Sequence, residues 1–279
     1  MELQKQLAYE FNLKEVYAEN IINLIDEGNT IPFIARYRKE MHGACDDQVL
    51  RDFADRLNYL RNLNKEKEKV EKVIKEQEKW TDEIAFALEN ALTLTEVEDI
   101  YRPYKPKRKT RATVAIAKGL EPLADIIQAQ EITEPVENVA KDYVSEEKGV
   151  NSIEEAIAGA KDIIAERISD DANLRKTLRE IIAKKAQIKA VWDEEADENK
   201  TYENYKDFVG DVAKIPSHRI LALNRGEKEK CLKVSIEINP KLTISEIEKV
   251  YKKDNEFTNQ IMDETILDSY DRLLFPSLE

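Results

Sequence analysis

The sequence of 279 residues has little of what builds disulfide frameworks, metal centres or loop-rich folds: it contains 2 cysteines, 2 histidines, 7 glycines and 8 prolines. Two cysteines are too few for a disulfide framework and match no paired metal-ligand spacing, so we expect reduced thiols in a reducing compartment. No apolar run approaches the roughly 20 residues that cross a bilayer. The first ten residues lack the basic and apolar regions of a signal peptide. We therefore predict a cytoplasmic protein that has no membrane segment.

Hydrophobic residues (42%) and charged residues (36%) dominate the sequence, as is typical of long amphipathic helices with charged outer faces. The length favours two packed units over one. The net charge of −13 argues against broad, nonspecific binding of nucleic acid, because phosphates are neutralised by a local surplus of Lys and Arg. A local basic patch could still bind phosphates.

A long helix is predicted from Asp46 to about Glu78, where there is neither Gly nor Pro and apolar residues recur every three or four positions. Charged residues interrupt this stripe between Asn62 and Lys69. We interpret that stretch as an exposed helical hairpin arm, followed by a returning helix and a capping box of Thr95 and Glu98.

A shorter helix with a basic side is predicted from Ile31 to Glu40, since Pro32 suits a first helical turn and Gly43 a termination. It carries Arg36, Arg38 and Lys39. We interpret this cationic run as structural, with Phe33, Ile34 and Tyr37 anchoring it to a core.

The most basic segment of the chain is Tyr101 to Arg111, where Pro103 and Pro106 prevent a regular helix. Its cations, which interleave with Tyr101 and Tyr104, are Arg102, Lys105, Lys107, Arg108, Lys109 and Arg111. Two interpretations stand side by side. The segment binds nucleic-acid phosphates, or its cations pair with carboxylates of this protein and fasten one helical layer to another.

Three helices are predicted between about Pro135 and Lys189, separated by a Ser152/Glu155 capping box and a turn at 169–171. They form a unit of helix-turn-helix type. The last helix, 172–191, carries Arg175, Lys176 and Arg179 on one face. The pattern favours an ordinary amphipathic helix over a DNA-recognition helix, but it fits both.

Beyond that unit, the acidic stretch 193–198 is a candidate domain boundary. A strand is predicted over 231–238 and a last helix near 245–274. The end of the chain shortly after Pro276 leads us to expect that a longer protein continues there.

Catalytic and metal sites are poorly supported. His42, Cys45, Asp46 and Asp47, or His218 with Cys231, would be the metal candidates, but neither set completes a familiar four-ligand spacing. Ser217 and His218 are adjacent without a nucleophile-elbow motif. Glycine-rich phosphate loops and dinucleotide fingerprints are absent from the sequence. We predict a protein that is not an enzyme and has no cofactor or metal.

Several sequence blocks together resemble the N-terminal part of the bacterial Tex family. They occur in the family's order and span most of the chain: Thr30 to Glu40 (TIPFIARYRKE), Asp46-Asp47, Asp55 to Leu60, Tyr101 to Arg108 (YRPYKPKR), Gly119 to Asp125 (GLEPLAD), Ile215 to Arg219 (IPSHR) and Arg225 to Glu227 (RGE).

The resemblance implies a transcription accessory protein related to a eukaryotic elongation factor. In that family a helical N-terminal region with an inserted helix-turn-helix unit precedes a ribonuclease-H-like domain, helix-hairpin-helix elements and an RNA-binding OB-fold domain. Nucleic-acid affinity is attributed mainly to that last domain, and no catalytic residue is carried over to this sequence.

We therefore predict an all-α, mainly helical fold, with an elongated body, an inserted helix-turn-helix-like unit and at most one short strand pair. The expected parts are 1–121, 122–195 and a segment 196–279 that packs back on the first. The predicted function is a non-catalytic scaffold of a transcription accessory protein. Its candidate contacts with RNA or DNA are Arg102, Lys105, Lys107, Arg108, Lys109, Arg111, Arg175, Lys176 and Arg179. The alternative is a protein-interaction module that docks on the transcription machinery without touching nucleic acid.

Overall fold

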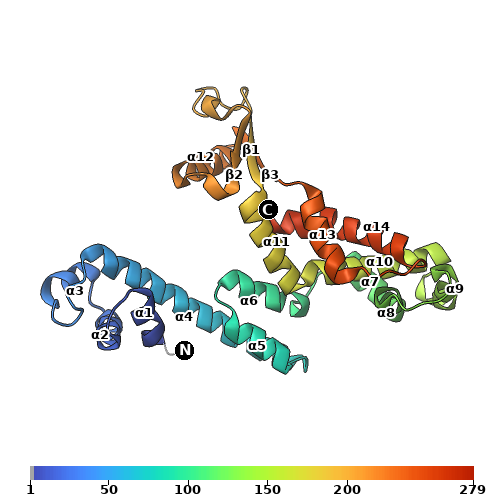
Figure 1. Cartoon of the computed structure of the whole chain (residues 1–279), viewed down its shortest axis with the longest axis horizontal. Coiled ribbons are helices and arrows are strands. Elements are labelled where there is room, and N and C mark those ends of the chain that lie inside the picture. Colours follow the sequence, from blue (N-terminus) through green and yellow to red (C-terminus); the bar gives the residue numbers. More distant parts are fainter. Residues whose placement is uncertain (1–2) are drawn as a thin grey trace. The chain divides into compact units, whose positions relative to one another are not determined.

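The computed structural model describes residues 3–279, and its contacts divide the chain into two compact units (Figure 1). Unit 1 is Met1–Tyr101 and unit 2 is Arg102–Glu279. The prediction of a mainly helical protein is confirmed. The three-part division at 121 and 195, and the packing of the third part on the first, stay predictions.

Unit 1 is built on one long helix, α4, which begins after Asp46, whose carboxylate accepts a hydrogen bond from the amide of Val49. This helix buries Leu50, Phe53 and Leu57 completely, and α1, α3, α5 and α6 contact it. The helices of unit 1 are α1 (Leu3–Glu10), α2 (Glu15–Asp26), α3 (Ile31–Tyr37), α4 (Asp47–Glu76), α5 (Asp82–Asn90) and α6 (Leu94–Tyr101).

The exposed arm predicted over 62–69 stays a prediction: most of its residues are exposed, but its apolar side is covered. Leu63 and Val70 are buried, and Nζ of Lys67 donates a hydrogen bond of 2.8 Å to the carbonyl of Glu89 at the end of α5. Burial lowers the pKa of Lys67. The aliphatic stem of a lysine can lie along apolar surface while its ammonium group meets a polar partner, so Lys67 continues the stripe at a position that reads as charged.

The cap of α6 lies two residues before the predicted pair of Thr95 and Glu98. The hydroxyl of Thr93 accepts a hydrogen bond from the amide of Glu96 (3.1 Å), and the Glu96 carboxylate accepts one from the amide of Thr93 (3.2 Å). This reciprocal pair satisfies two amides at the helix start.

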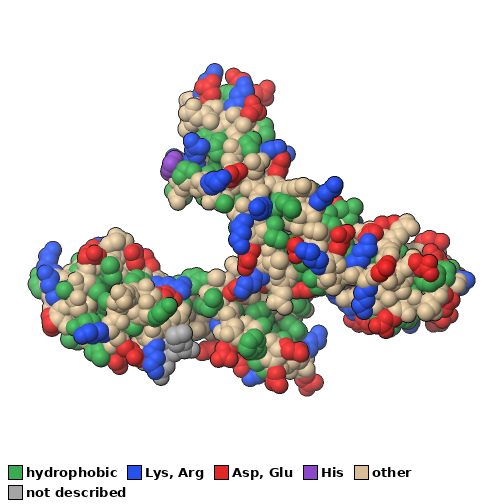
Figure 2. All heavy atoms as spheres, in the orientation of Figure 1, with side chains coloured by type: hydrophobic (Ala, Val, Ile, Leu, Met, Phe, Trp, Pro, Cys, Tyr) green, Lys and Arg blue, Asp and Glu red, His purple; other side chains and the backbone are tan. Residues whose placement is uncertain are grey.

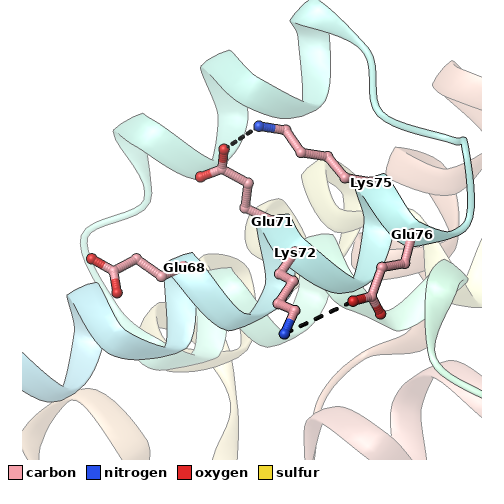
Figure 3. Close-up of a pocket in the computed structure, with 5 residues that line it drawn as sticks. All are labelled: Glu68, Glu71, Lys72, Lys75 and Glu76. Carbon is pink, nitrogen blue, oxygen red and sulfur yellow. Dashed lines mark hydrogen bonds and ion pairs between the residues drawn. The ribbon is translucent and has the colours of Figure 1, made fainter.

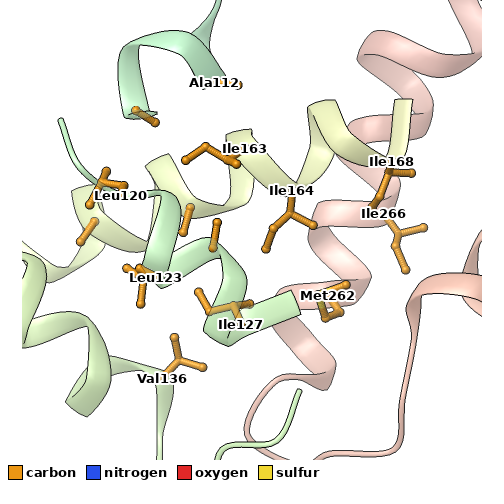
Figure 4. Close-up of a cluster of buried hydrophobic side chains, with 14 of the residues drawn as sticks. Ala112, Leu120, Leu123, Ile127, Val136, Ile163, Ile164, Ile168, Met262 and Ile266 are labelled. Carbon is orange, nitrogen blue, oxygen red and sulfur yellow. The ribbon is translucent and has the colours of Figure 1, made fainter. Parts of the chain in front are cut away.

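Unit 2 surrounds α10, a helix of 18 residues that begins after the predicted cap Ser152, whose hydroxyl accepts from the amide of Glu155. Its buried face carries Ile163, Ile164 and Ile168, which lie in one core with Leu123 and Ile127 (Figure 4). The helices of this unit are α7 (Arg111–Ala117), α8 (Glu121–Ala129), α9 (Val136–Ala140), α10 (Ile153–Asp170), α11 (Ala172–Lys185), α12 (Ser217–Lys228), α13 (Pro240–Tyr251), α14 (Asn259–Ser269) and α15 (Phe275–Leu278).

Helices from both ends of unit 2 share that core. Ile247 of α13, Met262 and Ile266 of α14, and Leu274 belong to the same buried cluster as the residues of α8 and α10. The helix predicted over 245–274 is therefore interrupted: α13 and α14 are separated by residues 252–258, and α14 continues as a π-helical segment, Tyr270–Leu274. Residues of the segment 122–195 thus share a buried cluster with α13 and α14.

A three-stranded antiparallel sheet follows α11, with the strand order β2-β1-β3. The strands are β1 (Gln187–Trp192), β2 (Phe208–Asp211) and β3 (Leu232–Glu237), and Ala190 of β1 pairs with Phe208 on one side and Val234 on the other. Two predictions are corrected here. The sheet has three strands, more than the strand pair expected, and the helix predicted to reach Val191 ends at Lys185.

The acidic stretch 193–198 lies in the connection between β1 and β2. Asp197 is buried within it, and its carboxylate accepts hydrogen bonds from Nε1 of Trp192 (2.9 Å) and the amide of Tyr202 (2.7 Å). These bonds lower the pKa of Asp197 against the opposing effect of its burial.

In the part of the chain that the structure describes, none of the helices combines the length and apolar character of a transmembrane segment.

Candidate nucleic-acid interface

The basic segment at the start of unit 2 forms a short 3-10 turn, Arg102–Tyr104, and a loop that ends at Thr110. Thr110 begins α7 with a reciprocal cap: its hydroxyl accepts from the amide of Thr113 (3.0 Å), and the Thr113 hydroxyl accepts from the amide of Thr110 (2.8 Å). We call residues 102–111 the basic loop. This cap fixes the end of the basic loop at the start of α7.

An acidic ridge on α10 faces the basic loop. Asp162, Glu166 and Asp170 are spaced four residues apart, which places them on one side of the helix. Asp170 accepts a hydrogen bond of 2.9 Å from Nε of Arg102, and Lys107 forms ion pairs with both Asp170 and Glu166, the latter at 3.0 Å. The Asp170 side chain is only 10% exposed. Arg102 and Lys107 therefore fasten the loop to α10.

The other cations of the basic loop lie at the surface. Lys105, Arg108, Lys109 and Arg111 are exposed, although Lys105 also has interactions within the protein. Among residues 3–279, no ion pair involves Arg108 or Lys109. Arg102 and Lys107 are thus paired with carboxylates of the protein, as one of the two interpretations expects, whereas Arg108 and Lys109 are exposed to solvent.

Arg111 contributes its charge to a second cluster at the start of the ridge. Burial raises the pKa of Asp162, and the charges of Arg272 and Arg111 oppose that effect. Hydrogen bonds from Arg272 lower the pKa of Asp268, and the charge of Arg111 acts in the same direction. Nη2 of Arg272 lies 3.1 Å from Asp162 and 2.5 Å from Asp268. Arg111 is therefore exposed to solvent, while its charge also acts on Asp162 and Asp268.

The basic face predicted on α11 is largely used inside the protein. Arg175 is 3% exposed, and its Nη1 donates to the carbonyl of Ser169 (3.2 Å) and to the hydroxyl of Ser277 (2.9 Å). Lys176 is exposed and Arg179 half-buried, and both also interact with other residues of the chain. Arg175 cannot reach a ligand from this position, so the predicted recognition face keeps two of its three cations.

The predicted turn between α10 and α11 is confirmed. Asp171 begins α11 by accepting hydrogen bonds from the amides of Asn173 and Leu174, and it also accepts one from the hydroxyl of Tyr251 at 2.8 Å. Burial, followed by the charge of Asp171, raises the pKa of Tyr251. The two helices are thus joined by the single residue Asp171. The helix-turn-helix assignment itself stays a prediction.

The residues considered as metal ligands or nucleophiles either have structural roles or differ in their exposure to solvent. His42 is fully buried, with Nε2 3.2 Å from the carbonyl of Ile34, while Asp46 caps α4. His218 is exposed on α12 and Cys231 is buried. Burial raises the pKa of both Cys45 and Cys231, which disfavours the thiolate that nucleophilic or metal-binding cysteines need. Between residues 3 and 279, the structure groups no three His, Cys, Asp or Glu side chains as a metal site.

A shallow hollow on α4 is lined by charged residues of that single helix: Glu68, Glu71, Lys72, Lys75 and Glu76 (Figure 3). Lys75 pairs with Glu71 at 2.5 Å and Lys72 with Glu76 at 3.9 Å. These are solvent-exposed pairs four residues apart. The hollow offers no convergent groups for a ligand.

Two family models match the chain. Residues 1–75 match the Tex-like protein N-terminal domain, and residues 131–269 match the Tex central region-like model. The chain is 46% identical over 280 residues to YdcI of Bacillus subtilis (strain 168), covering 99% of this chain and 39% of that protein. It is 39% identical over 241 residues to the transcriptional accessory protein Tex of Neisseria gonorrhoeae, covering 86% of this chain and 31% of that protein.

A human relative, S1 RNA-binding domain-containing protein 1, is 31% identical over 238 residues, covering 82% of this chain and 23% of that protein. The chain thus spans less than two fifths of the length of these relatives. The helical fold and these matches define the N-terminal and central regions of a Tex-type protein. The chain belongs to the Tex family.

Proposed function

We propose that this chain is a non-catalytic, cytoplasmic scaffold of a transcription accessory protein, and that it contacts nucleic-acid phosphates through the outward cations of the basic loop. The observation that carries the proposal is that some cations of the loop are paired inside the protein while others are exposed. Asp170 and Glu166 hold Arg102 and Lys107, while Arg108 and Lys109 stay exposed.

Such an arrangement suits phosphate binding because the loop is ordered before the ligand arrives. A cation on a fixed backbone loses less conformational freedom on binding than one on a mobile tail. The family supports the proposal: one relative is named a transcriptional accessory protein and another carries an S1 RNA-binding domain in its name. The net charge of −13 confines the contact to a local surface.

The test is a filter-binding titration of the chain with a single-stranded RNA and with a duplex DNA at low salt. The double variant Arg108→Ala/Lys109→Ala is expected to weaken binding about tenfold or more, since each lost phosphate contact removes counterion release. The control is Lys228→Ala/Lys230→Ala, two exposed lysines elsewhere in unit 2 that give the same change in net charge.

Equal affinities of the wild type and the Arg108→Ala/Lys109→Ala variant would refute the role of the loop. Equal losses in that variant and in the control would also refute it, because net charge would then account for the effect. A hydrolytic activity of the purified chain that disappears on changing His42 or His218 would refute the non-catalytic part of the proposal.

A further inference from the structure

A second cationic surface lies on α3 in unit 1, and its aromatic residues are not where the sequence pattern placed them. Of the three residues expected to anchor this helix, Ile34 is fully buried, Phe33 is half-buried and Tyr37 is 57% exposed. The prediction that Tyr37 packs in the core is wrong. Basic side chains gather at the end of unit 1 that α3 forms (Figure 2).

The cations of this surface differ from those elsewhere in unit 1. Arg36, Arg38 and Lys39 are all exposed, and no ion pair between described residues involves them. On α4 of the same unit, by contrast, Lys69, Lys72 and Lys75 each pair with a glutamate. A charge left without a partner in a chain rich in carboxylates is available to an external anion.

The aromatic rings stand among these cations. The Phe33 and Tyr37 rings contact each other with centroids 5.2 Å apart, and the Arg38 guanidinium lies over the Phe33 ring at 5.4 Å. The guanidinium, the Phe33 ring and the exposed Tyr37 ring form one continuous surface, which we call the α3 platform: Phe33, Arg36, Tyr37, Arg38 and Lys39.

The backbone beneath the α3 platform is held in place by groups of the following turn. The buried His42 bonds through Nε2 to the carbonyl of Ile34, and Nδ2 of Asn20 donates to the carbonyl of Met41 at 3.0 Å. Gly43 has φ +67°, and a Cβ there would lie 2.7 Å from the Tyr17 ring. This turn therefore ends α3 in a single geometry, so the platform is preorganised.

We infer that the α3 platform binds single-stranded nucleic acid, with a base stacked on Tyr37 and phosphates held by Arg36, Arg38 and Lys39. Exposed aromatic faces among unpaired cations fit a strand whose bases are free to stack. A duplex keeps its bases stacked on each other and offers only phosphates. The inference rests on the proposed function because both take nucleic acid as the ligand. The α3 platform, however, belongs to unit 1, whereas the basic loop belongs to unit 2.

The test measures binding of a fluorescein-labelled 12-nucleotide oligouridine, and of the matching oligothymidine, to the 279-residue chain. Tyr37→Ala is expected to weaken binding on the order of tenfold, and Arg36→Ala/Arg38→Ala/Lys39→Ala to weaken it further and flatten the salt dependence by roughly two units of slope. A larger loss with oligouridine assigns the site to RNA, and equal losses assign it to single strands of either sugar.

Matched controls separate recognition from charge and exposure. Tyr9→Ala removes a tyrosine that is 87% exposed on α1 beside Glu10. Lys69→Ala/Lys72→Ala/Lys75→Ala makes the same change in net charge on α4 of the same unit. Neither control is expected to alter affinity by more than about twofold. Circular dichroism melts establish that each variant is folded.

A second measurement does not depend on affinity. An oligonucleotide that contains 4-thiouridine, irradiated in complex with the chain, is expected to cross-link to the peptide that contains Tyr37. Unchanged affinity in Tyr37→Ala together with no cross-link in residues 31–39 would overturn the inference.

Three other outcomes would also refute the inference, and they show whether the proposed function fails with it. Displacement of the oligonucleotide by polyglutamate, with Tyr37→Ala binding normally, would assign the platform to acidic proteins and overturn the inference. If the Arg108→Ala/Lys109→Ala variant alone loses binding, the α3 platform is refuted and the proposed function stands. If the wild-type chain binds no oligonucleotide at low salt, both are refuted.

Discussion

Neutralising Asp170 tests whether the basic loop is fastened to α10 as the structure indicates. Asp170→Asn keeps the size of a side chain that is 10% exposed but removes the charge that meets Arg102 and Lys107. Removing one partner of a fully buried ion pair costs about 3–5 kcal/mol, whereas an exposed pair contributes about 0–1 kcal/mol.

The expected cost lies between these limits. Arg102 is 35% exposed, and Lys107 keeps Glu166 as a partner at 3.0 Å. We therefore expect Asp170→Asn to lower the free energy of unfolding by about 1–2 kcal/mol. For a domain of this size that corresponds to a fall in Tm of roughly 3–6 °C. Urea denaturation of the whole chain, followed by circular dichroism, measures the change.

The control is Asp125→Asn, whose carboxylate lies 2.7 Å from Arg167 but is 59% exposed. It is expected to cost less than about 0.5 kcal/mol. If Asp170→Asn is as stable as Asp125→Asn, the fastened loop is refuted.

Two further predictions test the packing and electrostatics of each unit. Gly226→Ala in α12 places a Cβ 2.6 Å from Leu232 Cδ1 and 3.0 Å from Tyr202 Cδ1, so we expect a net loss of about 1 kcal/mol in a urea melt despite the gain in helix propensity; a stabilised variant would contradict this packing. In unit 1, hydrogen bonds from Arg56 lower the pKa of Glu10 in the folded state. That pair stabilises the fold above the ordinary pKa of a glutamate, and its contribution disappears as the pH falls through the lowered value. Arg56→Met is therefore expected to be about 0.5–1 kcal/mol less stable than wild type at pH 7, with a difference that shrinks as the pH falls below the ordinary pKa of a glutamate. A difference that stays constant as the pH falls would contradict the assignment.

Local signals in the sequence predicted much of the helical fold. The limits of α4 follow from Asp46 as a cap and from the absence of Gly and Pro up to Glu76. The start of α10 follows from the capping preference of Ser152, and the start of α11 from that of Asp171. These features depend on residues within one helical turn of each other, so a single sequence contains all the information they need.

Features that depend on distant partners were missed. Residues 187–192 continue the apolar pattern of α11, and they become a strand because Phe208 and Val234, far along the chain, pair with Ala190 on its two sides. Lys67 reads as a charge in solvent until Glu89 accepts its hydrogen bond. Tertiary context decides such positions.

The candidate site shows the same limit. The composition of the basic loop identified the segment, but it could not divide its cations between interior and solvent. That division depends on Asp170 and Glu166, which lie about sixty residues later in the sequence and have no signal that distinguishes them from other surface carboxylates. The exposure of Tyr37 was equally hidden, because an aromatic residue at helical spacing from Phe33 normally packs inward.

The salt dependence of binding tests the central claim most directly. The logarithm of the association constant for a duplex DNA falls with the logarithm of salt concentration by about 0.9 per phosphate neutralised. If Arg108 and Lys109 each contact a phosphate, the Arg108→Ala/Lys109→Ala variant will show a slope shallower than wild type by about 2, while Lys228→Ala/Lys230→Ala keeps the wild-type slope. A variant with the wild-type slope would contradict the claim that this loop is the phosphate-binding surface of the scaffold.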